Sequence, residues 1–427
     1  MGSGRPNGHA HRLAADGGRR LARAGLRAAK SGDTHGAANL LTRAASLLDA
    51  EEVVRRDLLV ELGLVLWRAG EVGAAEKTLT SALDSAIAAH ERRAEVRARL
   101  ELANLNLFRK PEGGAEALVG LTAESLPLLE ELGDARALGR IWYVLAFVRG
   151  GLHCQYRESE EAAKRAVLYF RESGWPVAPC IQELGASLYY GPTSVPDAIA
   201  RCRELLDGVD RGGEAHIIGF LACLEAMEGR FGDARALILR ARTIYEDLAW
   251  TVNVTTNYAP LAADIELLAG NHEAAERLIE KSCATLEEWG ELAHLATQAT
   301  LLGEALYAQN RHDEALRWAD VASSCAASDD VGAQFSWRAL RAKALAHQGA
   351  LDEAEALARE AAEGAAATDS ISQHASVLLA LGEVLWLSGQ APAAAECIEE
   401  ACVLLESKGN RVGARHARAK LDDVRSA

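Results

Sequence analysis

The stretch LGEVLWLSGQAPAAAECIEEA, residues 381–401, repeats the pattern of an earlier stretch of the same chain, LGLVLWRAGEVGAAEKTLTSA at residues 62–82. In both, leucines at helical spacing lead to a turn glycine, and small residues follow five and twelve positions beyond it. Apolar residues at helical spacing on both sides of a turn glycine predict two helices joined by a tight turn. A helix pair that occurs twice in one chain indicates a repeat protein.

Comparable turns recur along the chain, mostly 38 to 41 residues apart. The seven clear turn residues are Gly32, Gly70, Gly229, Gly270, Asn310, Gly349 and Gly389. Glycine, and less often asparagine, tolerates the positive φ at which one helix ends before the next begins. Irregular turns near Lys110, Gly151 and Gly191 divide the wide gap after Gly70. The spacing therefore predicts about ten units of ~40 residues.

Two positions after each clear turn are always small. The residue five positions on is Ala37, Ala75, Ala234, Ala275, Ala315, Ala354 or Ala394, and the residue twelve positions on is Ala44, Ala82, Ala241, Ser282, Ala322, Ala361 or Ala401. Small side chains let one helix approach another closely, so the second helix of each pair should pack against large residues of the first. Because one pair buries too little apolar surface to offset its ordering entropy, the units must stack.

We therefore expect an all-α fold, an α-solenoid of about ten TPR-like helix hairpins that forms a curved superhelix. The turn glycine followed by two alanines is typical of tetratricopeptide repeats, although their usual period is about 34 residues. HEAT and armadillo repeats share the longer period and are the alternative. We expect a flexible leader over residues 1–15 and one repeat domain over residues 16–427, with a capping helix around Gly413 to Val424. Pro260 should kink or shorten the helix before Gly270.

The composition of the chain limits the classes of partner that it can bind. The 427 residues carry a net charge of −15, and seven of the basic residues lie within residues 1–30, so the remaining body is strongly acidic and unsuited to nucleic acid. No stretch is apolar enough for a membrane helix, and the amino terminus lacks a signal-peptide core, so we expect a cytoplasmic protein without a membrane partner. The eight scattered cysteines are expected to be free thiols.

No motif for chemistry is present in the sequence. The chain has no phosphate-binding G-x-x-x-x-G-K-[ST], no H-E-x-x-H, no G-x-S-x-G and no zinc-type spacing of Cys and His. We therefore expect no catalytic residue, no cofactor and no metal, and a protein that is not an enzyme.

A polar row marks the candidate binding site. Asp264, Glu304, Lys343 and Glu383 each stand six residues before a turn, on the face expected to line the concave groove. Near this row lie Asn257, Thr297, Thr300, Tyr307 and Trp386. Such a row could hold a protein or peptide partner, or a small polar ligand, through converging hydrogen bonds. A solvated groove with incidental salt bridges is the alternative.

Several segments resemble those of a known family in their residues as well as in their periodicity. They include LEAMEGRFGDARALILRAR, LLGEALYAQNRHDEALRWAD and SGQAPAAAECIEEACVLLESKGN. From about residue 28 to about residue 410, the chain resembles the C-terminal TPR-like region of large bacterial multidomain regulators. In those proteins an adenylate/guanylate cyclase or another effector domain precedes an AAA/STAND-type ATPase.

The resemblance implies a non-catalytic scaffold for protein interaction and signal sensing, the regulatory arm of such a regulator. No cyclase or ATPase activity is implied, because the motifs of those domains are absent. The alternative is a peptide- or sugar-binding receptor that uses the concave groove, with a pocket closed by the loops around Gly151 and Gly191.

Overall fold

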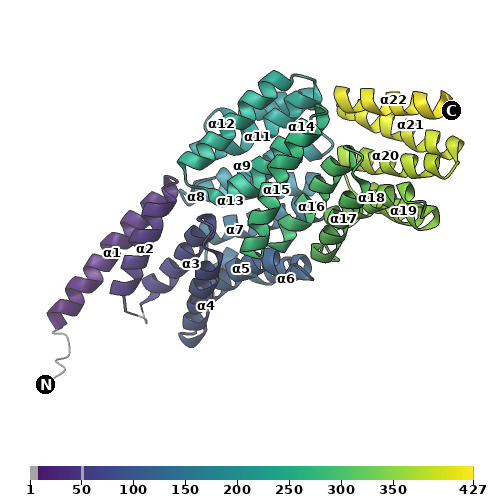
Figure 1. Ribbon diagram of the computed structural model, residues 1–427. Helices are drawn as coiled ribbons and strands as arrows, with labels where there is room; N and C mark the ends of the chain where they lie inside the picture. The colour runs from purple at the N-terminus through teal and green to yellow at the C-terminus, as the bar shows by residue number, and fades with distance from the viewer. Residues whose placement is uncertain (1–7, 50–51, 427) are drawn as a thin grey trace.

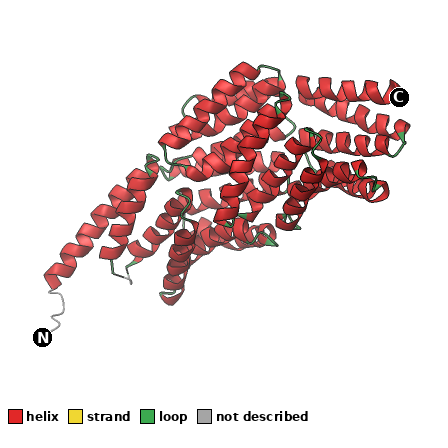
Figure 2. Cartoon of the chain, viewed as in Figure 1, coloured by secondary structure: helices red, strands yellow, loops and turns green. Residues whose placement is uncertain are grey.

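A computed structural model describes residues 8–49 and 52–426, and this part of the chain forms helices and connecting loops without a strand (Figures 1 and 2). Ten helix pairs follow one another within these residues, and the two helices of each pair pack together. The pairs are α1 (Gly8–Lys30) with α2 (Thr34–Leu47), α3 (Val53–Arg68) with α4 (Val72–Ala88), α5 (Arg92–Arg109) with α6 (Gly114–Glu131), α7 (Ala135–Phe147) with α8 (Tyr156–Glu172), α9 (Ala178–Tyr190) with α10 (Val195–Leu206), α11 (Arg211–Met227) with α12 (Phe231–Asp247), α14 (Ala259–Leu268) with α15 (His272–Trp289), α16 (Leu292–Tyr307) with α17 (His312–Cys325), α18 (Val331–His347) with α19 (Leu351–Ala366), and α20 (Ile371–Leu387) with α21 (Ala391–Lys408). A final helix, α22 (Arg411–Ser426), packs on α21 where a capping helix is predicted. The predicted α-solenoid of TPR-like hairpins is confirmed.

The turn residues and the small residues explain why the pairs form. All seven predicted turn residues have positive φ, from 61° at Asn310 to 86° at Gly229. The alanines five positions beyond them are fully buried, and the small residues twelve positions beyond are at most 4% exposed. A Cβ added at Gly382 would lie 2.7 Å from Ile398 on the facing helix. The helices of a pair therefore approach as closely as the sequence pattern predicts.

Two pairs contain a π-helical segment. In the pair that ends with α15, α13 (Thr251–Asn253) and the π-helix η2 (Val254–Tyr258) precede α14, and Pro260 lies in the first turn of α14. Proline lacks a backbone N–H and clashes with the preceding turn, so a wider turn before Pro260 accommodates the break. In the other pair, the π-helix η1 (Val148–Leu152) extends α7 and carries the glycines of the irregular turn.

The amino-terminal end differs from the predicted leader. Residues 8–15 form the first turns of α1, while residues 1–7 lie outside the described residues. α1 packs on α2 and extends beyond its end, since Gly17 and Gly18 already lie beside Leu47 and Leu48. The hairpin projects from one end of the molecule, opposite the end that carries α22 (Figure 1).

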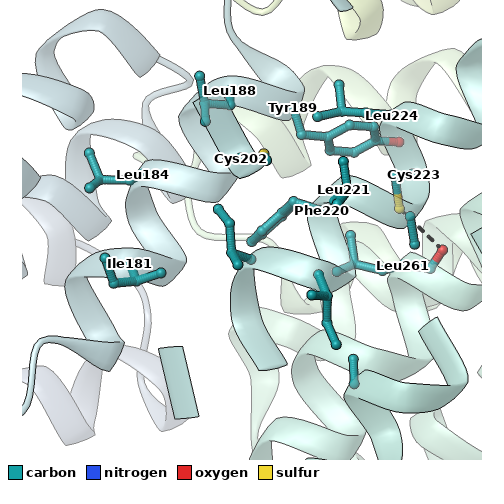
Figure 3. Close-up of a cluster of buried hydrophobic side chains, with 14 of the residues drawn as sticks. Ile181, Leu184, Leu188, Tyr189, Cys202, Phe220, Leu221, Cys223, Leu224 and Leu261 are labelled. Atoms are coloured by element: carbon teal, nitrogen blue, oxygen red, sulfur yellow. Dashed lines mark hydrogen bonds between the residues drawn. The ribbon is translucent and has the colours of Figure 1, made fainter. Parts of the chain in front are cut away.

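The largest buried apolar cluster lies mainly among α8 to α12 and α14. In this core, the rings of Tyr189 on α9 and Phe220 on α11 lie 6.2 Å apart, and the Cys223 thiol donates a hydrogen bond of 3.5 Å to the Leu261 carbonyl (Figure 3). All eight cysteines are free thiols, as predicted.

The superhelix completes one turn after about five helix pairs, and the next turn then contacts the first. Hydrogen bonds join residues separated by 214 positions at Thr34 to Leu248 and at Ala115 to Asp329, and by 213 positions at Tyr156 to Asp369. One superhelical turn therefore takes about 214 residues. The second turn lies directly on the first.

Charged side chains make several of the contacts between turns. The Asp369 carboxylate accepts the backbone N–H groups of Tyr156 and Arg157 at 2.6 and 2.9 Å, which caps the amino terminus of α8 from the opposite turn. Lys408 is fully buried, and its Nζ donates to the carbonyls of Leu188, Gly191 and Thr193.

Two of these contacts fall on the loops around Gly151 and Gly191. The Asp369 N–H donates to the Cys154 carbonyl, and Lys408 donates to the Gly191 carbonyl. The turns are irregular there because their exposed backbone groups have partners far along the chain. No helix within residues 8–49 and 52–426 is long and apolar enough to cross a membrane.

Candidate functional site

Four of the nine predicted site residues come together in one cluster, named here the C-terminal cluster: Glu304, Tyr307, Lys343 and Glu383. The Lys343 ammonium lies 2.6 Å from Glu304 and 4.3 Å from the centre of the Tyr307 ring. The Tyr307 hydroxyl donates a hydrogen bond to Glu383, and Lys420 of α22 lies 2.7 Å from the same carboxylate. Each charged group of the predicted row thus has a partner inside the protein.

The charges of the C-terminal cluster are balanced by one another. Burial opposes the charge of Glu383, but the nearby ammonium groups of Lys343 and Lys420 outweigh it and lower the pKa of Glu383 to about 2. The rings of His312 and His347 stack at 4.1 Å beside Tyr307. This cluster ties α16, α18, α20 and α22 together.

The other five predicted residues are dispersed. Asp264 is close to the Tyr189 hydroxyl at 3.5 Å, and burial raises its pKa to about 7. Thr300 is buried and donates to the Ala296 carbonyl of its own helix. Thr297 and Trp386 are exposed. Asn257 alone borders a cavity, where its side-chain amide exchanges hydrogen bonds with Gln182 at 3.2 and 3.4 Å.

That cavity belongs to a larger concavity inside the first superhelical turn, named here the inner hollow. It consists of three adjoining cavities of about 110, 90 and 30 Å³. Arg68 and Pro179 line all three, Trp250 lines two, and Arg140 lines two. The walls of the largest cavity come from α3, α5, α7, α9, α11, α13, η2 and α16, so a full superhelical turn surrounds it.

Aromatic rings form one wall of the inner hollow. The Phe108 ring stacks on the His294 ring with centres 5.1 Å apart and planes 2° from parallel, which joins α5 to α16. Trp67 and Phe147 flank Phe108 at 5.2 and 5.3 Å. Flat apolar faces beside a few polar groups are typical of binding sites for small ligands and peptide side chains.

Arginines and carboxylates line the smallest of the three cavities. Arg140 donates to Glu101 through two guanidinium nitrogens, and Arg97 bridges Glu61 at 2.7 Å and Asp57. Arg136 pairs with Glu61, and its guanidinium lies 3.3 Å above the centre of the Trp175 ring. The wall is a network of charge-assisted hydrogen bonds, which holds its side chains in fixed positions.

Arg68 stands apart from that network. It is half-buried at the carboxyl end of α3, with its guanidinium 5.7 Å from the centre of the Trp250 ring. Among the described residues it makes no ion pair and no side-chain hydrogen bond. Burial, and after it the positive charge of Arg140, lowers the pKa of Arg68.

The sequence carries no distinct signal for Arg68. Arg68 stands two residues before its turn glycine, where the other units have Lys30, Met227, Leu268, Ala308, His347 and Leu387. Because basic residues recur at this position, the repeat pattern alone does not single out Arg68.

The described residues contain no group of three or more His, Cys, Asp or Glu side chains that could hold a metal ion. The inner hollow instead offers hydrogen-bond donors, amide groups and aromatic faces in an enclosed space. This arrangement can bind and orient a ligand.

Comparisons with known proteins give no family. No protein-family model and no curated protein matches the chain. Among solved structures, it is similar to yeast Tom70, with 12% sequence identity and a TM-score of 0.41 over 95% of this chain and 89% of that chain. It is also similar to a Rap protein complexed with competence and sporulation factor, with 13% identity and a TM-score of 0.40 over 87% and 98% of the two chains. At these values the two likenesses add nothing to the evidence on function.

Proposed function

We propose that the chain is a non-catalytic interaction protein whose inner hollow receives a peptide or an extended segment of a partner protein. The observation that carries this proposal is the enclosure of the hollow by a full superhelical turn, with aromatic rings around its largest cavity and a fixed polar network around its smallest. Side chains of a peptide require both kinds of surface, and TPR-like superhelices provide them along one inner face.

The enclosure also suggests how binding would be transmitted. An occupant would touch helices that begin and end one superhelical turn, so its contacts would favour one spacing between those helices. Because the second turn lies on the first through Asp329, Asp369 and Lys408, a change of spacing would extend along the molecule. The finer proposal, a regulatory arm of a signalling ATPase- or cyclase-type regulator, is supported by the resemblance of the repeat phrases.

A filled-hollow variant tests the proposal. Thr256 lines the largest cavity, so Thr256→Trp should occupy that space, whereas Thr297→Trp adds the same ring to an exposed position on α16. Pooled synthetic hexapeptides would be passed over the three purified proteins, and retained peptides identified by mass spectrometry. We expect wild type and Thr297→Trp to retain the same peptides and Thr256→Trp to lose them. Retention by all three proteins, or by none, would overturn the proposal.

A further inference from the structure

Arg68 is the only guanidinium in the described wall of the inner hollow without a carboxylate partner. Arg97, Arg136 and Arg140 all pair with Glu61 or Glu101, and both of these carboxylates are buried. Arg68 lines each of the three cavities and contacts only an aromatic ring. Its charge therefore faces the space that a ligand would fill.

The charge balance of the wall leaves this cation in surplus. The chain as a whole has 61 acidic and 46 basic residues, so acidic side chains are abundant. The lack of one opposite Arg68 is therefore not explained by composition. The carboxylates whose charges act on Arg68 are Glu61 and Glu101, and both are already paired with Arg97, Arg136 or Arg140. A half-buried cation without a partner is unfavourable, and an anionic ligand would relieve it.

We propose that the segment bound in the inner hollow presents a carboxylate to Arg68, with an apolar or aromatic side chain against Trp250 and Phe108. This inference rests on the proposed function and names the chemistry of its ligand. A guanidinium holds a carboxylate through two parallel hydrogen bonds, which fixes the orientation of the ligand as well as its charge. A single free cation matches the single charge of a carboxylate.

The carboxylate can come from two sources, the carboxyl terminus of a peptide or an Asp or Glu side chain. The experiment therefore uses each retained hexapeptide in three forms: unchanged, with its carboxyl terminus amidated, and with its Asp and Glu replaced by Asn and Gln. Affinities are measured by isothermal titration calorimetry with wild type, Arg68→Gln and Arg277→Gln. Arg277 is an exposed arginine on α15 that lines none of the three cavities, and it serves as the matched control.

We expect one of the two neutral forms to bind wild type roughly 10- to 100-fold more weakly, as the loss of a charge-assisted hydrogen bond predicts. Arg68→Gln should bind the unchanged peptide with the same loss and should not distinguish it from that neutral form. Arg277→Gln should behave as wild type.

Equal affinity of wild type for all three forms would overturn the carboxylate proposal and leave the proposed function standing. This comparison needs no variant, so it holds even if Arg68→Gln does not fold. Absence of binding of any hexapeptide would instead overturn the proposed function together with its ligand chemistry.

Discussion

The C-terminal cluster and the inner hollow are both polar networks on the first helices of successive pairs, yet one is complete and the other is not. In the C-terminal cluster, Glu304 has Lys343, and Glu383 has Tyr307 and Lys420. In the inner hollow, Arg140 has Glu101, while Arg68 faces an open cavity. A network in which every charged group has a partner holds helices together. A network with one unpaired charge leaves that charge available to a ligand.

The largest effect should follow from breaking a completed pair of the hollow. Arg140→Met leaves Glu101, which is only 3% exposed, without its guanidinium. An uncompensated buried charge should lower the local stability of α5 and α7 by about 4 kcal/mol. Hydrogen exchange of the backbone amides in these helices measures that loss.

The double variant Arg140→Met with Glu101→Met is the control, because it removes both charges and should recover most of the stability. Unchanged exchange in the single variant would mean that Glu101 is hydrated, and the wall would then not be the fixed network described above.

The C-terminal cluster should show a smaller effect that depends on pH. Glu383→Gln weakens its contacts with the two lysines and should destabilise α20 by about 2 kcal/mol at pH 7. Because the pKa of Glu383 is lowered to about 2, its stabilisation is present above the ordinary value of 4.5 and is lost as the pH falls through 2. Unfolding of the two proteins, followed by circular dichroism from pH 7 to pH 2, should therefore converge at the acid end.

Glu399→Gln provides the comparison for Glu383→Gln. Glu399 pairs with Arg425 on the surface, where both side chains are about half exposed, so its replacement should change stability by less than about 0.5 kcal/mol. If the difference between wild type and Glu383→Gln stayed constant over the pH range, the lysines would not be setting the charge of Glu383.

The smallest expected effect on stability distinguishes the inner hollow from the C-terminal cluster most directly. Arg68→Gln removes a cation that has no ion pair among the described residues, so the stability of α3 should change by less than about 0.5 kcal/mol or rise slightly. Hydrogen exchange under the conditions used for Arg140→Met makes the two arginines directly comparable. A loss as large as that of Arg140→Met would show that Arg68 serves the fold, and the hollow would then have no unmet charge.

The fold could be predicted because its determinants are local and repeated. Each turn residue, such as Gly70 or Asn310, reports a positive φ at its own position, and each small residue, such as Ala75, reports one close helix contact. Because the repeat recurs in many units, each of these local signals appears several times along the chain. The leader was less predictable, since α1 continues through residues 8–15 beyond the end of α2, where residues 10–13 are exposed and no packing pattern marks the helix.

The candidate site could be predicted only in part, because its walls do not follow a single position of the repeat. The position six residues before the turn is polar at Glu304, Lys343 and Glu383, and this pattern identified the C-terminal cluster. In the unit that ends at Gly70 the same position is Leu64, and the cation is Arg68. Contacts such as Phe108 on His294 depend on how far the superhelix advances in one turn, which no local pattern specifies.

The spacing of about 214 residues between contacting turns has a consequence for how the chain is made. Asp329, Asp369 and Lys408 complete the amino ends and carbonyls of helices that leave the ribosome far earlier. At ordinary rates of synthesis those early helices would wait roughly 10 to 40 s for their partners. During that interval the first half of the nascent protein would expose to water the backbone groups that the second turn later covers.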